Sequence, residues 1–102
     1  MTLRIRVAAV ILLATSIANT AFAQARGADA YKAKCARCHG DDGLATTPVA
    51  KRTGIESFKS PEMMKWSDGQ FIAFTKKTYT DHGPTDAQIK DIVAYIRKLQ
   101  KQ

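Results

Sequence analysis

The stretch CARCHG, residues 35–40, places two cysteines and a histidine within five positions. Cysteine and histidine at this spacing serve three chemistries in proteins: a redox dithiol, a structural zinc site, or the covalent attachment of a haem. Each chemistry needs different surroundings in the chain, so the sequence on both sides of the motif decides between them.

The first 23 residues have the pattern of a secretory signal peptide. Arg4 and Arg6 precede an apolar run over residues 7–17, and small residues favour cleavage after Ala23. The apolar run is too short to span a bilayer comfortably. We therefore expect export to the periplasm or an equivalent extracytoplasmic space, and a mature domain of residues 24–102. Either a disulfide or a covalent cofactor is stable in that compartment.

The expected mature domain is small and basic. Its 79 residues lie near the lower limit at which a hydrophobic core alone offsets the chain entropy, so a covalent staple or a bound group is expected. Removal of Arg4 and Arg6 lowers the formal net charge from +7 to +5. A basic surface favours an acidic protein partner or an anionic membrane surface. Nucleic acid is not an expected partner, because the exported chain has no recognised binding motif.

The segments around the motif predict helices and loops. Residues 27–40 are rich in alanine and lysine and predict a short helix that Asp29 caps or favours near its start. Residues 41–60 contain scattered glycine and proline, and predict an irregular loop with at most one turn of helix. Residues 67–79 predict a second helix with Ser67 as its N-cap.

The C-terminal segment, residues 85–102, gives the strongest helix pattern in the chain, with Thr85 as its N-cap. Apolar residues recur there at steps of three and four, at Ile89, Ile92, Val93, Ile96 and Leu99. The chain shows neither strand-like alternation nor an internal repeat. The predicted fold class is all-α, with three to four short helices and long loops, which is unusual without a central group to wrap around.

The redox and zinc interpretations fit these surroundings poorly. A redox dithiol requires its cysteines at the start of a helix beside a βαβ unit, whereas here they lie late in a predicted helix. A zinc site would combine Cys35, Cys38, His39 and His82. However, adjacent helical side chains diverge by about 100°, and the spacing matches no zinc finger.

Attachment of a haem explains all three residues of the motif together. Cys35 and Cys38 lie on the same side of a helical turn, from which they reach the two vinyl groups on one porphyrin edge. His39 then presents its imidazole to the iron. We predict one haem c, bound covalently through Cys35 and Cys38, with His39 as the proximal iron ligand.

Over residues 25–100 the chain resembles the small single-haem class I cytochromes c. In that family, a glycine eight residues before the first cysteine and an aromatic four before it cross an aromatic of the last helix. Gly27, Tyr31 and Tyr95 occupy these places. The resemblance implies the class I cytochrome c fold, in which short helices and long loops wrap around one covalently bound haem.

The resemblance also implies further contacts to the haem iron and its ligands. Pro48 stands where the family has a proline whose carbonyl accepts a hydrogen bond from the proximal imidazole of His39. The family usually has a methionine as the distal ligand, in the loop before the last helix, and this chain has His82 in that loop. We expect His82 to be the distal ligand. Met64 or Met63, or an open sixth position, are the alternatives.

These features predict an electron-transfer protein that carries one electron on its haem. The alternatives are a small-ligand binder or sensor with an open sixth site, and a haem subunit of a larger redox assembly. No arrangement suited to hydrolytic catalysis is present in the sequence, and we expect no enzymatic activity. The expected partners are redox proteins with an acidic docking face. Peripheral association with a membrane redox complex, and self-assembly, stay open.

Overall fold

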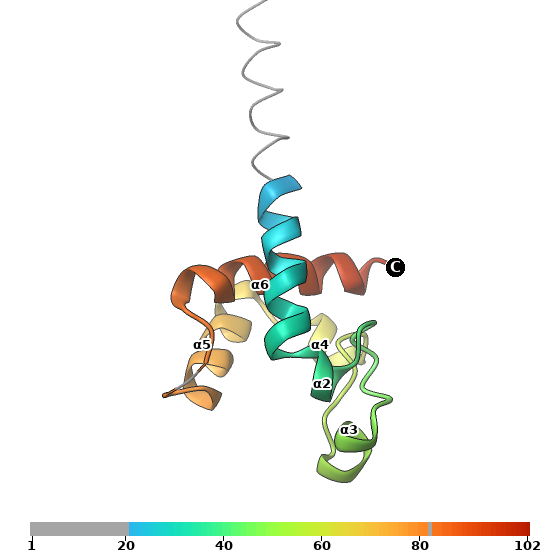
Figure 1. Cartoon of the computed structure of the whole chain (residues 1–102). Helices are drawn as coiled ribbons and strands as arrows, with labels where there is room; N and C mark the ends of the chain where they lie inside the picture. The colour runs from blue at the N-terminus through green and yellow to red at the C-terminus, as the bar shows by residue number, and fades with distance from the viewer. Residues whose placement is uncertain (1–20, 82) are drawn as a thin grey trace, which may run out of the picture.

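The computed structural model describes residues 21–81 and 83–102 (Figure 1). Most of the predicted signal peptide and the whole of His82 lie outside the described residues, so the signal peptide stays a prediction. In the described part of the chain all regular structure is helical and no strand occurs, which confirms the all-α fold class. In the same part, no helix is long and apolar enough to cross a bilayer.

The helices follow the predicted order. The N-terminal helix, helical over 21–34 within the described residues, is succeeded by α2 (Ala36–His39), α3 (Pro48–Thr53), α4 (Pro61–Met64), α5 (Asp68–Thr78) and α6 (Asp86–Gln100). The N-caps expected for the last two, Ser67 and Thr85, are confirmed, and each belongs to a reciprocal capping box. The role expected for Asp29 is wrong, because the chain is already helical at residue 21 and Asp29 lies within the helix.

Two short helices, α3 and α4, raise the number of helical segments above the three to four expected. Each begins with proline at its first helical position, directly after a hydroxyl residue. The hydroxyl of Thr47 accepts a hydrogen bond from the Ala50 amide at 3.1 Å, and that of Ser60 accepts one from the Met63 amide at 3.2 Å. These caps satisfy amides that a short helix leaves free, and they stabilise helices in a region rich in loop-forming residues.

The N-terminal helix crosses α6 at close range (Figure 1). A Cβ atom added to Gly27 would lie 2.1 Å from the main-chain oxygen of Asp91 and 3.2 Å from the Cβ of Tyr95. One turn later, the fully buried Tyr31 ring lies with its centroid 5.2 Å from that of Tyr95. The crossing that the resemblance implied for these residues is therefore present, and glycine permits it.

The core forms between this crossing and the other helices. The apolar stripe predicted for α6 is buried along its whole length. It packs with Tyr31 and Cys35 of the N-terminal segment, Phe58, and Phe71 of α5. Helix α6 thus forms one side of the space in front of the CxxCH motif.

Candidate cofactor site

A cavity of about 520 Å³ opens beside the CxxCH motif. This size lies within the range of pockets that bind small molecules and cofactors. Cys35, Cys38 and His39 all line the cavity, so the structure brings the three residues of the motif to one site. The surrounding wall is mainly apolar and comes from segments far apart in the sequence, including Phe58, Met63, Trp66, Phe71, Ile92 and Ile96.

The main chain folds the motif into a single tight turn. The Cys35 amide donates to the Tyr31 carbonyl at 2.7 Å, and the amides of Cys38 and His39 both donate to the Cys35 carbonyl, at 3.2 and 3.0 Å. Helix α2 ends at His39, and its C-cap is Gly40, whose φ of 85° favours glycine. This turn places both cysteines at the same cavity.

Two hydroxyl groups support this turn, and sequence reasoning missed both contacts. The buried Tyr31 hydroxyl donates to the Gly40 carbonyl at 2.7 Å. The Thr47 hydroxyl donates to the Cys38 carbonyl at 2.5 Å while it caps α3. Thr47 therefore joins the motif to α3. Threonine directly before Pro48 is a recognised start signal for a helix and could have revealed the cap, but not its contact with Cys38.

The imidazole ring of His39 stacks on a neighbouring aromatic ring, and one of its nitrogen atoms is buried without a hydrogen bond among the described residues. Its ring stacks on Phe58, with centroids 4.7 Å apart and an interplanar angle of 19°. Within the described residues the buried Nδ1 atom has no hydrogen-bond partner, which is uncommon for buried polar atoms. Burial also lowers the pKa of the His39 imidazole, which favours the neutral form that binds metals.

The hydrogen bond that the resemblance implies between His39 and Pro48 is not formed in this structure, because Nδ1 of His39 is unpaired. Pro48 lies exposed at the first position of α3, and it does not line the cavity. Helix α3 nevertheless packs against α2, which carries His39. The role of Pro48 toward the proximal ligand stays a prediction.

The two cysteines are free thiols. Cys35 is 8% exposed, and burial, followed by the nearby Cys38, raises the pKa of its thiol to about 11. A reactive dithiol needs a lowered thiol pKa, so this environment disfavours the redox interpretation. Within the described residues, which exclude His82, no group of three or more His, Cys, Asp or Glu residues is placed to hold a metal ion.

The structure separates the two methionines that sequence analysis treated together. Met63 is partly buried, packs against the core and lines the cavity. Met64 is 49% exposed and does not line the cavity, so its candidacy as an iron ligand lacks support in this structure. Met63 is therefore the methionine at the site.

The loop expected to supply the distal ligand starts at the cavity. Tyr79, at the end of α5, lines the cavity, and its pKa is raised by burial and then by Cys35 and Cys38. Gly83 packs tightly on Tyr79, because an added Cβ would lie 2.2 Å from the Tyr79 Cβ. His82 itself lies outside the described residues. Sequence reasoning missed Tyr79 as a cavity residue.

The features of the site suit a covalently bound haem. Cys35 and Cys38 at one cavity would hold the ring by thioether bonds, and the imidazole of His39, which lines the same cavity and is kept neutral by burial, would bind the iron. Mainly apolar walls of aromatic and aliphatic side chains suit a large apolar ring.

Comparison with known proteins agrees with this assignment. The family model described as "Cytochrome C oxidase, cbb3-type, subunit III" matches residues 22–96, about three quarters of the chain. The match spans the CxxCH motif, the segments that form the cavity wall, and most of α6. No curated protein and no solved structure matches the chain. The chain belongs to the family of cytochrome c oxidase, cbb3-type, subunit III, and is a small c-type cytochrome domain.

Proposed function

We propose that this protein is an exported electron carrier that holds one c-type haem through Cys35 and Cys38. The observation that carries the proposal is the position of both cysteines and His39 at one mainly apolar cavity. When bound there, the haem supplies one-electron redox chemistry. The chain's contribution is to hold the ring, bind the iron through His39 and keep water away from it, which together tune the reduction potential.

A redox titration with a ligand-binding measurement tests this function. We expect the purified protein to be reduced and oxidised in a single one-electron step. The ferrous form is expected not to bind carbon monoxide, because two strong axial ligands leave no position for it. Rapid formation of a carbon monoxide complex, seen in the optical spectrum, would instead favour the small-ligand sensor.

We propose His82 as the distal iron ligand, with Met63 as the alternative. Replacing His82 by alanine is expected to convert the ferric protein from a low-spin to a high-spin spectrum, because the iron loses one strong axial ligand. Met63→Ala is expected to keep the low-spin spectrum. Optical and electron paramagnetic resonance spectra of the ferric proteins measure the change.

Met64→Ala is the matched control for the methionine variant. Met64 is next to Met63 in the sequence but does not line the cavity, so its replacement is expected to leave the spectrum unchanged. A low-spin His82→Ala protein together with a high-spin Met63→Ala protein would reassign the distal ligand to Met63.

The proposed partners are redox proteins with an acidic docking face. The formal net charge of +5 for residues 24–102, which remain after the proposed cleavage, supports such a partner, and its binding would weaken with added salt. The name of the matched family also supports a second proposal, in which the domain associates with a membrane redox complex as one of its haem subunits. We propose a periplasmic location and no enzymatic activity of its own.

A further inference from the structure

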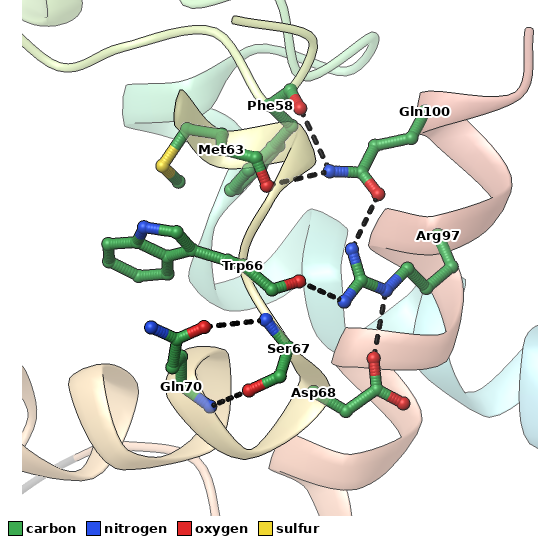
Figure 2. Close-up of polar contacts among 8 residues, drawn as sticks. All are labelled: Phe58, Met63, Trp66, Ser67, Asp68, Gln70, Arg97 and Gln100. Carbon is green, nitrogen blue, oxygen red and sulfur yellow. Dashed lines mark hydrogen bonds and ion pairs between the residues drawn. The ribbon is translucent and has the colours of Figure 1, made fainter. Parts of the chain in front are cut away.

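Two polar side chains of α6 bind the main chain behind the cavity wall (Figure 2). Nη2 of Arg97 donates to the carbonyl of Trp66 at 2.5 Å. Nε2 of Gln100 donates to the carbonyl of Phe58 at 2.9 Å and to that of Met63 at 3.5 Å. Arg97 and Gln100 also bind each other, through an Nη1 to Oε1 hydrogen bond of 2.8 Å. We call this pair of side chains the α6 clamp.

The clamp extends to the start of α5. Nε of Arg97 donates to the carboxylate of Asp68, the first residue of α5, at 2.8 Å. The guanidinium carbon of Arg97 lies 4.9 Å from the centroid of the Phe71 ring, one turn further along α5. Because the Arg97 side chain is only 27% exposed, its bonds are partly shielded from water. Arg97 thus contacts α5 in two ways, through an ion pair with Asp68 and through a cation–π contact with the Phe71 ring.

The clamp acts on residues that line the cavity. Phe58, Met63, Trp66 and Phe71 each contribute to its wall, and the clamp touches all four. In Phe58, Met63 and Trp66 the clamp binds the main-chain carbonyl oxygen. The clamp therefore holds the main chain of residues 58–66 in position. That segment contains one helical turn, α4, and most of its other hydrogen bonds join residues close together in the sequence. Besides the clamp, the Phe58 amide donates to the Gly43 carbonyl at 3.0 Å, and Nζ of Lys59 donates to the Gln102 carbonyl.

We propose that Arg97 and Gln100 are positioning residues of the haem site, which hold the wall over 58–66 against the bound ring. The proposal rests on the proposed function, because it requires the cavity to be the haem site. Neither side chain lines the cavity, so both act through the residues they hold. Loss of the clamp would let the wall move, and the haem spectrum and reduction potential would change with the packing and water access of the ring.

Two substitutions that preserve charge test the proposal. Arg97→Lys keeps the positive charge, but a single ammonium group cannot reproduce the planar fork that reaches Asp68, Trp66 and Gln100 together. Gln100→Met removes both donors to the wall at similar side-chain size and no change of charge. Lys98→Arg is the matched control, because it exchanges one basic residue for another, without a change of charge, at an exposed position of the same helix outside the clamp. Each variant is prepared as the full haem-loaded protein.

Two readouts separate positioning from folding stability: the g-values of the ferric protein and the reduction potential. We expect Arg97→Lys and Gln100→Met each to shift both quantities beyond any shift in Lys98→Arg. If both variants keep the wild-type g-values and potential and lose only resistance to denaturant, the clamp is merely structural and the proposal is overturned. Should Arg97→Lys fail to fold, Gln100→Met alone decides by the same criterion. Failure of the proposed function would appear differently, as a wild-type protein without covalent haem.

Discussion

Simultaneous replacement of Cys35 and Cys38 by alanine is expected to abolish covalent retention of haem. Both thiols line the cavity, and the structure offers no other cysteine, since the sequence contains only these two. Without a thioether bond, any haem in the cavity is held by His39 and apolar contact alone and is extracted by denaturation in acid and acetone. Haem staining after denaturing electrophoresis measures the loss, with the expectation of strong staining in the wild type and none in the variant.

Single substitutions and a control within the motif sharpen this result. Cys35→Ala and Cys38→Ala should each retain one thioether bond, which leaves one vinyl group intact and moves the α-band of the reduced pyridine complex to longer wavelength. Arg37→Gln is the matched control, because Arg37 lies between the cysteines but is exposed and does not line the cavity. A double variant that still stains like the wild type would refute attachment through these residues.

The position of Cys35, Cys38 and His39 at one site could be predicted from the sequence, because the three residues lie close together in the chain. Cys35, Cys38 and His39 lie within one helical turn, and their spacing alone places the two thiols on one side. The packing of Gly27 against α6 could also be predicted, through the family resemblance. Both features depend on a few residues at fixed spacing.

The wall of the site could not be predicted in the same way, since it depends on contacts between distant segments. The bonds from Gln100 to Phe58 and from Arg97 to Trp66 join residues 42 and 31 positions apart. No periodic pattern in the sequence indicates which of these distant residues bind each other. The clamp therefore appears only in the folded structure, although the helix that carries it was predicted well.

The sequence alone also does not show which of the adjacent residues Met63 and Met64 faces the cavity. Neighbouring positions on a helix point about 100° apart, so a small change in where α4 begins decides which methionine faces the cavity. Ser60 followed by Pro61 is the sequence signal for that start, and the expected helices do not include α4. With the cap in place, Met63 lines the cavity and Met64 is half exposed.

Gly27→Ala is expected to destabilise the domain strongly, although Gly27 does not line the cavity. The new Cβ would lie 2.1 Å from the Asp91 carbonyl oxygen, which is main chain and cannot rotate away, so the N-terminal helix must move off α6. Overpacking of this kind costs about 1–3 kcal/mol, and for a domain of this size each kcal/mol lowers the melting temperature by roughly 4–8 °C. Thermal unfolding followed by circular dichroism measures the change.

Gly69→Ala separates this clash from the general effect of replacing a glycine in a helix. Gly69 lies in the first turn of α5, where the nearest atom to an added Cβ is the Ser67 hydroxyl oxygen at 3.8 Å, an ordinary contact. Alanine is the better helix former, so this control should leave stability unchanged or raise it by up to about 1 kcal/mol. Equal melting temperatures for the two variants would mean that the N-terminal helix does not pack on α6 at Gly27. A large loss in Gly27→Ala alone would establish that the N-terminal helix lies against α6 at Gly27.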